Sequence, residues 1–220
     1  MRRLLLLAAL AASGLRPALA QRAPAWVLKT TPQHLVLSGY WLEAEHAPPG
    51  RPGYTLTLAP QLYWGPTGRP DSPRLPLDLL RSGTVRGGGV QIQPRLYLHA
   101  AATGVPTGPY LGIAPQVQVF RLRYERLVWH EEASSPYGIP LLVLGPVPAA
   151  ETVLRYGVAA QVGYQWALSS RVRLDVYAGV GVRRSQVWTA GGASQFTSGP
   201  SDYAHQGAYV PAGLKLGVVL

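Results

Sequence analysis

The sequence predicts an all-β fold, specifically an eight-stranded antiparallel up-and-down transmembrane barrel. Three observations favour this fold class. Apolar and polar residues alternate with a period of two along most of the 220-residue chain. The connections between these segments are short and long in turn, as in outer-membrane barrels with tight periplasmic turns and long external loops. The apolar faces also stay free of charge over lengths that suit a membrane.

The N-terminus has the three parts of a secretory signal peptide. Arg2 and Arg3 make a positive start, a short apolar stretch follows, and an Ala-Leu-Ala cleavage site ends at Ala20. We therefore expect a signal peptide over 1–20 and a barrel over 21–220. Such a leader argues against nucleic acid as a partner.

Composition excludes several classes of protein. The chain has no cysteine, which excludes disulfides, cysteine-bound zinc and iron–sulfur clusters. Outside the N-terminus, no apolar run reaches the length of about 18 residues that a transmembrane helix needs. The formal net charge of +10 indicates that phosphates or anionic lipid headgroups are favourable partners.

The period-two alternation defines the expected strands in chain order. The third strand sets Leu56 against Thr57, and the fourth sets Ile92 against Gln91. The seventh sets Val176 against Asp175. A helical period would mix these sets. The eight expected strands cover residues 24–32, 36–48, 53–65, 88–100, 108–128, 151–168, 171–188 and 207–220.

Three of these strands contain proline, and one changes phase. Pro60, Pro94 and Pro115 lack the N–H of a β ladder, so we expect bulges or locally broken ladders there. In the fifth strand the alternation slips at Val119 and Phe120, which predicts a bulge.

The connections and the tryptophans support a membrane orientation. Apart from a short first outer connection around 32–35, the outer connections are long and rich in Gly, Pro and Ser: 66–87, 129–150 and 189–206. The inner ones are short: 48–53, 101–107 and 169–170. Tryptophans lie at strand ends, where aromatic girdles meet lipid headgroups: Trp64, Trp129, Trp166 and Trp188.

The polar parity carries charged residues of both signs in the half that we place on the periplasmic side: Lys29, Glu43, Glu45, Arg95, Arg173, Asp175 and Lys215. Buried charges persist only when they are paired. An interior of eight strands also leaves little bore. We therefore predict a structural ion-pair network that plugs the lumen. The alternative is a charged constriction that selects small anions, helped by residues higher up: Arg121, Arg123, Arg155 and Arg183.

Catalytic motifs are weak. The run His130-Glu131-Glu132, followed by Ser134 and Ser135, falls in an expected loop and lacks the spacing of a zinc protease helix. The chain has no nucleophile elbow and no P-loop. We expect no enzyme, no metal site and no cofactor.

Two short motifs open a different interpretation. Residues 39–41 (Gly-Tyr-Trp) and 201–203 (Ser-Asp-Tyr) are similar to lipocalin signatures. In a soluble lipocalin-like carrier, the apolar faces would line a ligand cavity and the polar faces would meet water. Glycines on the polar parity count against a wet surface, which would carry Lys and Glu instead: Gly157, Gly163, Gly179, Gly181, Gly213 and Gly217.

Five segments resemble a Bacteroidetes-type outer-membrane β-barrel family of unknown function. They are WVLKTTP at 26–32, YWLEAE at 40–45, GPYLGIAP at 108–115, VGYQW at 162–166 and LDVYAGVG at 174–181. The resemblance spans most of the chain beyond the leader. It implies a barrel in the outer membrane and supplies no catalytic residues.

Together these observations predict a monomer in the cell outer membrane with a structural, adhesive or surface-loop binding role. The expected partners are outer-membrane lipid and the outer-membrane assembly machinery. The loop at 66–87 would contact lipopolysaccharide phosphates or be simply solvated; its charged residues are Arg69, Arg74, Arg81, Arg86, Asp71 and Asp78. The alternative functions are a narrow passive pore for small solutes and the soluble carrier.

Overall fold

The computed structural model describes residues 25–67, 83–99, 104–132, 141–189, 194, 196–197 and 199–220. The expected signal peptide lies outside the described residues. So do several charged or nucleophilic residues singled out above: Arg69, Asp71, Arg74, Asp78, Arg81, Ser134 and Ser135.

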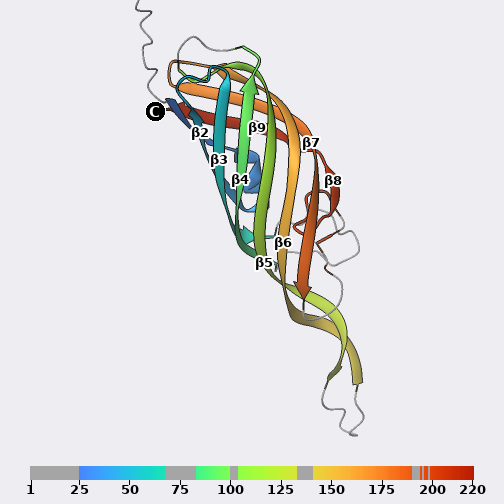
Figure 1. Cartoon of the computed structure of the whole chain (residues 1–220). Helices are drawn as coiled ribbons and strands as arrows, with labels where there is room; N and C mark the ends of the chain where they lie inside the picture. Colours follow the sequence, from blue (N-terminus) through green and yellow to red (C-terminus); the bar gives the residue numbers. More distant parts are fainter. Residues whose placement is uncertain are drawn as a thin grey trace, which may run out of the picture.

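A single antiparallel sheet contains the strands of the described residues and closes into an eight-strand ring (Figure 1). Its strands are β1 (Ala25–Thr30), β2 (Gly39–Ala47), β3 (Tyr54–Pro66), β4 (Thr84–Tyr97), β5 (Gly108–Glu132), β6 (Leu141–Ala167), β7 (Val172–Thr189), β8 (Gly207–Tyr209) and β9 (Ala212–Val219). Strands β1 to β7 pair in sequence order. β7 then pairs with β9, and β9 pairs with β1. The predicted all-β antiparallel fold is confirmed.

The last expected strand, 207–220, is divided into two parts. β8 and β9 both pair with β7, and the interruption falls at Val210 and Pro211. Proline has no N–H to donate, so a break in the strand at this position is a direct consequence of the sequence.

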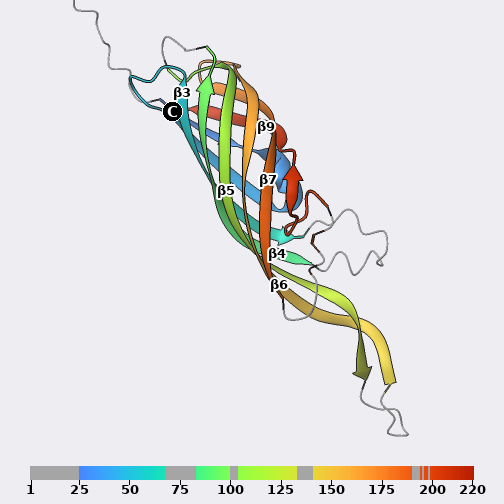
Figure 2. The ribbon, with the colours of Figure 1, turned by 45° about the vertical axis from the view of Figure 1, so that its right-hand side comes forward.

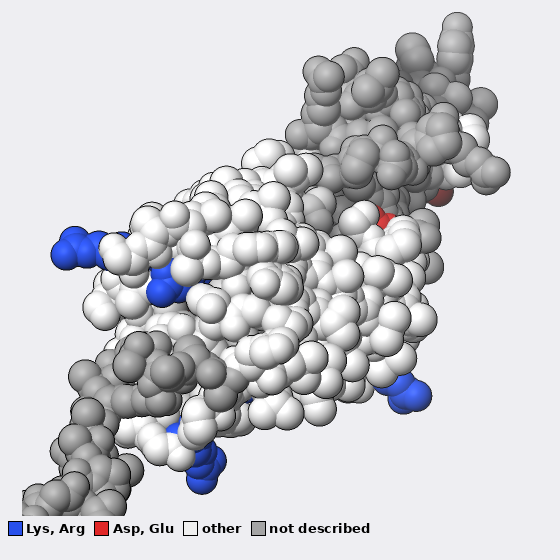
Figure 3. All heavy atoms as spheres, turned by 90° about the horizontal axis from the view of Figure 1, so that it is seen from above, with Lys and Arg blue, Asp and Glu red and all other residues white. Residues whose placement is uncertain are grey.

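Alternate residues face the two sides of the ring as the period-two pattern requires. Gln93 and Asp175 are completely buried inside, whereas their neighbours Ile92 and Val176 are 45% and 43% exposed outside. On the face drawn in Figure 3, Lys and Arg appear toward the ends of a broad surface without charged side chains. At these positions the interior is therefore polar and the belt around it apolar.

Proline interrupts the sheet without shifting its register. Between β2 and β3 the paired residues stop at Pro60, and between β4 and β5 they stop at Pro94 and Pro115. The register is the same on both sides of each gap, so these are broken ladders rather than bulges. The prediction of a bulge at 119–120 is wrong, because β5 pairs there with both neighbouring strands in one continuous register.

The phase change in β5 has a different cause. Phe120, Leu122 and Tyr124 are buried inside the ring, whereas Arg121 and Arg123 are exposed outside. The strand continues unbroken while the polarity of its two faces is exchanged, as in a sheet whose outer face meets water. The expectation that Arg121 and Arg123 line the interior is therefore wrong.

β5 and β6 continue past the other strands as a curved two-stranded ribbon (Figures 1 and 2). Their pairing runs on to Glu132 and Leu141, so the loop expected at 129–150 is largely strand. Pro146 and Pro148 suggested a loop there. In this part of the ribbon β6 pairs only with β5, and proline is tolerated on such an edge strand.

The first connection contains a 3-10 helix, η1 (Pro32–Leu37), which makes β1 and β2 shorter than expected. Ser38 ends the helix in a left-handed conformation, with φ of 53°. The His34 ring stacks on Trp41 with ring centres 3.7 Å apart, which holds η1 against β2. Within the described residues, no helix is long and apolar enough to cross a membrane.

Candidate functional site

Five strands bring six charged side chains together inside the ring. Each is at most 2% exposed: Lys29, Glu43, Glu45, Arg95, Asp175 and Lys215. We call these residues the ion-pair cluster. Strand pairing alone brings opposite charges together at two places. Lys29 lies opposite Glu43 across β1 and β2, and Asp175 lies opposite Lys215 across β7 and β9. Three cations face three carboxylates, so the cluster is electrically balanced.

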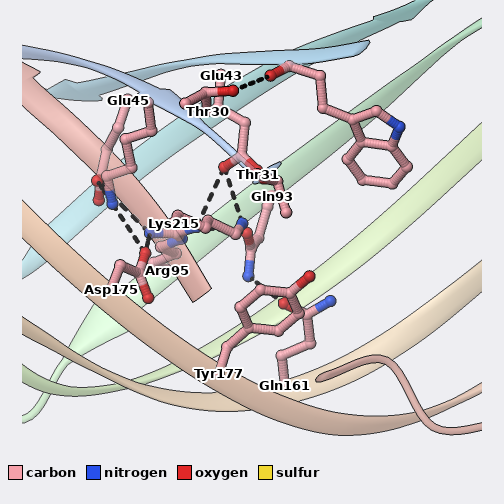
Figure 4. A network of polar contacts seen from close by, with 12 residues as sticks. Thr30, Thr31, Glu43, Glu45, Gln93, Arg95, Gln161, Asp175, Tyr177 and Lys215 are labelled. Atoms are coloured by element: carbon pink, nitrogen blue, oxygen red, sulfur yellow. Dashed lines mark hydrogen bonds and ion pairs between the residues drawn. The ribbon is translucent and has the colours of Figure 1, made fainter. Parts of the chain in front are cut away.

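Arg95 is the centre of the cluster (Figure 4). Its guanidinium nitrogens lie 2.7 Å from Asp175 Oδ2, 3.5 Å from Glu45 Oε2 and 3.6 Å from Glu43 Oε2. Because one planar cation meets all three carboxylates, strands β2, β4 and β7 are tied together across the interior.

The two lysines complete the pairing. Lys29 Nζ lies 2.6 Å from Glu45 Oε2 and 2.9 Å from Asp175 Oδ2. Lys215 Nζ lies 2.8 Å from Glu43 Oε2. Each carboxylate therefore has two cations within ion-pair distance, which offsets the cost of taking these charges out of water.

Neutral hydroxyl groups occupy the remaining carboxylate oxygens. Thr31 donates to Glu43 Oε1 at 3.0 Å, and Thr55 and Tyr97 donate to Glu45 Oε1 at 2.6 and 2.8 Å. Sequence reasoning concentrated on charged residues and missed these donors. Their signal was available, since Thr55 and Tyr97 lie on the buried parity of β3 and β4.

Tyr110 supplies the hydroxyl for the third carboxylate, 2.7 Å from Asp175 Oδ1, and it needs a glycine beside it. A Cβ at Gly163 would collide with the Tyr110 ring. A Cβ at Gly217 would likewise lie 2.7 Å from Cγ of Lys29. Glycines on the polar parity therefore make room for long polar side chains in a narrow interior.

Arg173, the seventh residue expected in the network, does not join it. Its guanidinium donates to the backbone oxygens of Ser169 and Val172 at 2.8 and 3.2 Å, where it holds the β6–β7 turn. Among the described residues it forms no ion pair. Parity correctly places its side chain on the buried face, but its position at the end of β7 takes it away from the cluster.

A polar cavity of about 360 Å³ is the second feature of the interior. It is lined by five glutamines, four tyrosines, Trp41, His34 and two arginines, Arg155 and Arg183. Pro200, Ser201 and Tyr203 cover part of it. The glutamines were not recognised from the sequence, because uncharged amides carry little signal. Residues 201–203 were singled out only as a lipocalin-like motif, and not as part of a polar cavity.

Arg155 and Arg183 face the interior, as expected of them. They are 7% and 8% exposed. Arg155 Nε donates to Gln118 at 2.7 Å and Nη1 to the backbone oxygen of Asp202 at 3.1 Å, while Arg183 donates to the backbone oxygen of Pro200. In the described part of the chain, neither arginine has a carboxylate within ion-pair distance, 4.0 Å.

Residues outside the strands line one side of the cavity. The Tyr203 hydroxyl donates to the backbone oxygen of Leu37 at 3.0 Å, and burial raises the pKa of Tyr203. Burial lowers the pKa of His34 to about 4, although Glu43 acts in the opposite direction. The His34 imidazole is therefore neutral at pH 7.

The arrangement offers binding and structural chemistry. Among the described residues, no group of three His, Asp or Glu side chains is placed to hold a metal ion. No protein-family model matches the chain, and no curated protein matches its sequence.

Proposed function

We propose that the chain is a monomeric β-barrel of the cell outer membrane that serves as a closed, membrane-embedded support for surface contacts. The observation that carries this proposal is the distribution of polar and apolar side chains over the two faces of the ring. Around the ion-pair cluster, apolar side chains cover the outside and paired charges fill the inside, the reverse of a water-soluble sheet. An apolar surface of this extent needs a partner, and lipid is the partner that covers a closed belt.

Strand length and aromatic residues support a membrane location. β3, β4 and β7 have 13, 14 and 18 residues. A tilted transmembrane strand needs about 9–11 residues. The side chains of several tryptophans are exposed on the outer surface: Trp26, Trp64, Trp129, Trp166 and Trp188. Indole rings favour the boundary between lipid and water.

The ion-pair cluster supports a barrel that does not conduct. Eight strands enclose an interior just wide enough for side chains to fill, and Arg95 bridges it to strands on different sides. A pore would require these buried pairs to separate. The soluble carrier needs its apolar faces inside the ring, whereas the apolar residues Ile92, Val158 and Val176 are 45%, 41% and 43% exposed outside.

The β5–β6 ribbon supports a role in surface contact. It projects beyond the ring on the side of the expected external connections, and it exposes Trp129 and Leu142 to 67% and 65%. Apolar residues on an exposed two-stranded ribbon are contact points for another molecule. In this proposal the ribbon carries the adhesive role.

Arginines next to the belt support a contact with lipopolysaccharide phosphates. Arg86, expected in the 66–87 loop, lies in β4 directly opposite Arg121 of β5, and Arg123 follows on the same face. Like charges placed opposite each other on a sheet are unfavourable unless an anion lies between them. The Arg86 guanidinium also lies 4.7 Å above the Trp64 ring, where the belt ends.

Membrane insertion and conductance test the proposal. We expect the protein in the outer-membrane fraction, with faster gel migration before boiling than after it, and no single-channel steps in planar bilayers. Replacing Arg86, Arg121 and Arg123 with Gln should weaken retention on immobilised lipopolysaccharide, while Arg51→Gln in the β2–β3 turn should not. A protein that stays monomeric and folded without detergent would refute the membrane location, and regular conductance steps would refute the closed barrel.

A further inference from the structure

The polar cavity holds two buried positive charges, and none of the carboxylates in the described part of the chain forms an ion pair with them. Arg155 and Arg183 are both more than nine-tenths buried. In the ion-pair cluster, by contrast, every buried cation meets a carboxylate within 4.0 Å. A buried charge without a partner is costly, so its presence indicates that a partner arrives from outside.

We propose that this cavity binds a small organic anion, with a carboxylate or phosphate held by Arg155 and Arg183 and a hydroxylated body held by the surrounding amides. Guanidinium groups match both kinds of oxyanion because they present several N–H donors in one plane. The inference does not depend on whether the ring lies in a membrane.

The strand register places the two arginines side by side. Across β6 and β7, Arg155 lies opposite Ser185, and Arg183 lies opposite Gly157, so the two arginines are diagonal neighbours on the inner face. A Cβ at Gly157 would lie 2.8 Å from Cβ of Arg183. The glycine therefore leaves the space in which the Arg183 side chain lies next to Arg155.

Unused hydrogen-bonding atoms surround the arginines. Arg183 Nε, Gln33 Oε1 and His34 Nε2 are buried and have no hydrogen-bond partner among the described residues, and all three residues line the cavity. Buried polar atoms are rarely left unpaired in proteins. A donor and an acceptor beside the arginines suit the hydroxyl groups of a ligand.

Asp202, whose charge acts on Arg183 without forming an ion pair, does not fill this role. Asp202 directs its carboxylate to the backbone N–H of Gly199 at 2.8 Å, and only its backbone oxygen reaches Arg155. The cavity of about 360 Å³ lies at the small end of the range for ligand sites, roughly 300–1,000 Å³. It therefore suits an anion of the size of one sugar acid or one sugar phosphate.

Binding can be measured on the folded full chain in detergent by isothermal titration calorimetry. The probes are D-glucuronate for the carboxylate, D-glucose 6-phosphate for the phosphate, inorganic phosphate, and D-glucose as the uncharged match. We expect saturable binding of glucuronate or glucose 6-phosphate, with inorganic phosphate weaker and glucose without effect. Binding of none of the anions, or equal binding of glucose, would overturn the proposal.

Variants separate a ligand site from a structural one. Arg155→Gln and Arg183→Gln should each weaken binding of the anion at least tenfold. Arg184→Gln is the matched control, because Arg184 is the next residue and lies exposed on the opposite face of β7. Equal losses in Arg184→Gln and Arg183→Gln, or no loss in Arg183→Gln, would contradict the assigned site.

Stability without ligand gives a second measurement that does not need the right probe. In buffer free of organic anions and phosphate, Arg183→Gln should keep or raise the urea midpoint of unfolding, because it removes an unpaired buried charge. Arg95→Gln should lower the midpoint, because it removes one of the two cations that lie near each of the three buried carboxylates. If Arg183→Gln lowers the midpoint as much as Arg95→Gln does, Arg183 has a structural role and the proposal fails.

Discussion

Both halves of the ring interior contain buried cations, but the two halves treat these charges differently. In the ion-pair cluster, three cations and three carboxylates satisfy one another at distances from 2.6 to 3.6 Å. In the cavity half, Arg155 and Arg183 are 7% and 8% exposed, and among the described residues their hydrogen-bond partners are neutral. Strand β7 contributes to both halves, with Asp175 in one and Arg183 in the other. The difference teaches that placement of carboxylates, and not the polarity of the strand face, separates a structural interior from one prepared for a ligand.

Removing a carboxylate from the cluster should have the largest effect on this comparison. Asp175→Asn leaves Lys29 and Arg95 with one carboxylate fewer in a buried site. We expect the free energy of unfolding, measured by urea titration in lipid vesicles, to fall by about 3–5 kcal/mol. Asp202→Asn is the control, since the Asp202 carboxylate caps a loop outside the cluster. Equal losses in the two variants would show that the cluster has no special role.

The comparison also depends on which face of each strand lies inside, and Val176 tests that. Val176 is the neighbour of Asp175 on the outer face. Val176→Arg would place a charge against lipid and should cost about 2–4 kcal/mol at the middle of the bilayer. Folding into vesicles, followed by the shift in gel migration, measures it. Exposed Arg184→Lys, which keeps its charge, serves as the control, and wild-type folding of Val176→Arg would contradict the assignment of faces.

A smaller substitution can sharpen the account of how the cluster is packed. Gly163→Ala would push the Tyr110 ring away and weaken its 2.7 Å hydrogen bond to Asp175. We expect a loss of about 1–3 kcal/mol, as for other overpacked sites. Gly88→Ala is the matched control in β4, where the nearest atom to an added Cβ is 3.5 Å away. Unchanged unfolding of Gly163→Ala would mean that Tyr110 moves freely and does not fix Asp175.

The sequence predicts the cluster half better than the cavity half, for a physical reason. Charges on one parity of strands of regular register must meet inside, so six of the seven expected residues come together. Arg173 does not join the cluster, because parity predicts which face a side chain lies on but not its position along the barrel axis. Interactions of neutral groups, such as the Tyr97 hydroxyl with Glu45, have a weaker signature, because parity places Tyr97 inside but there is no charge that must be paired.

The exchange of polarity in β5 explains the errors in the cavity half. The alternation Phe120, Arg121, Leu122 has the same period as the rest of the strand, but its apolar side faces inward. From sequence alone, this pattern cannot be distinguished from a bulge, because both reverse the order in which apolar and polar residues alternate. Only the paired register of β5 with β4 and β6 decides between them.

His34 lies between the two halves and should report on both with the smallest effect. Its pKa in the folded protein is lowered by burial to about 4, with Glu43 opposing and Lys215 and Arg155 assisting the shift. The unfolded chain therefore takes up a proton as pH falls below about 6.5, whereas the folded protein does so only near pH 4. The contribution of His34 to stability is therefore complete above about pH 6.5 and declines as the pH falls toward 4. The free energy of unfolding should fall by about 1–2 kcal/mol between pH 7 and pH 5.

Urea titrations at pH 7, 6 and 5 measure this decline, and His34→Gln should abolish the part that His34 contributes. An anion bound beside Arg155 would favour the protonated imidazole and raise the pKa of His34. The decline should then be smaller in a saturating concentration of the anion than without it, and the Arg183→Gln variant should lose that difference. A decline that is the same in wild type and His34→Gln would mean that the imidazole does not sense the charges of either half.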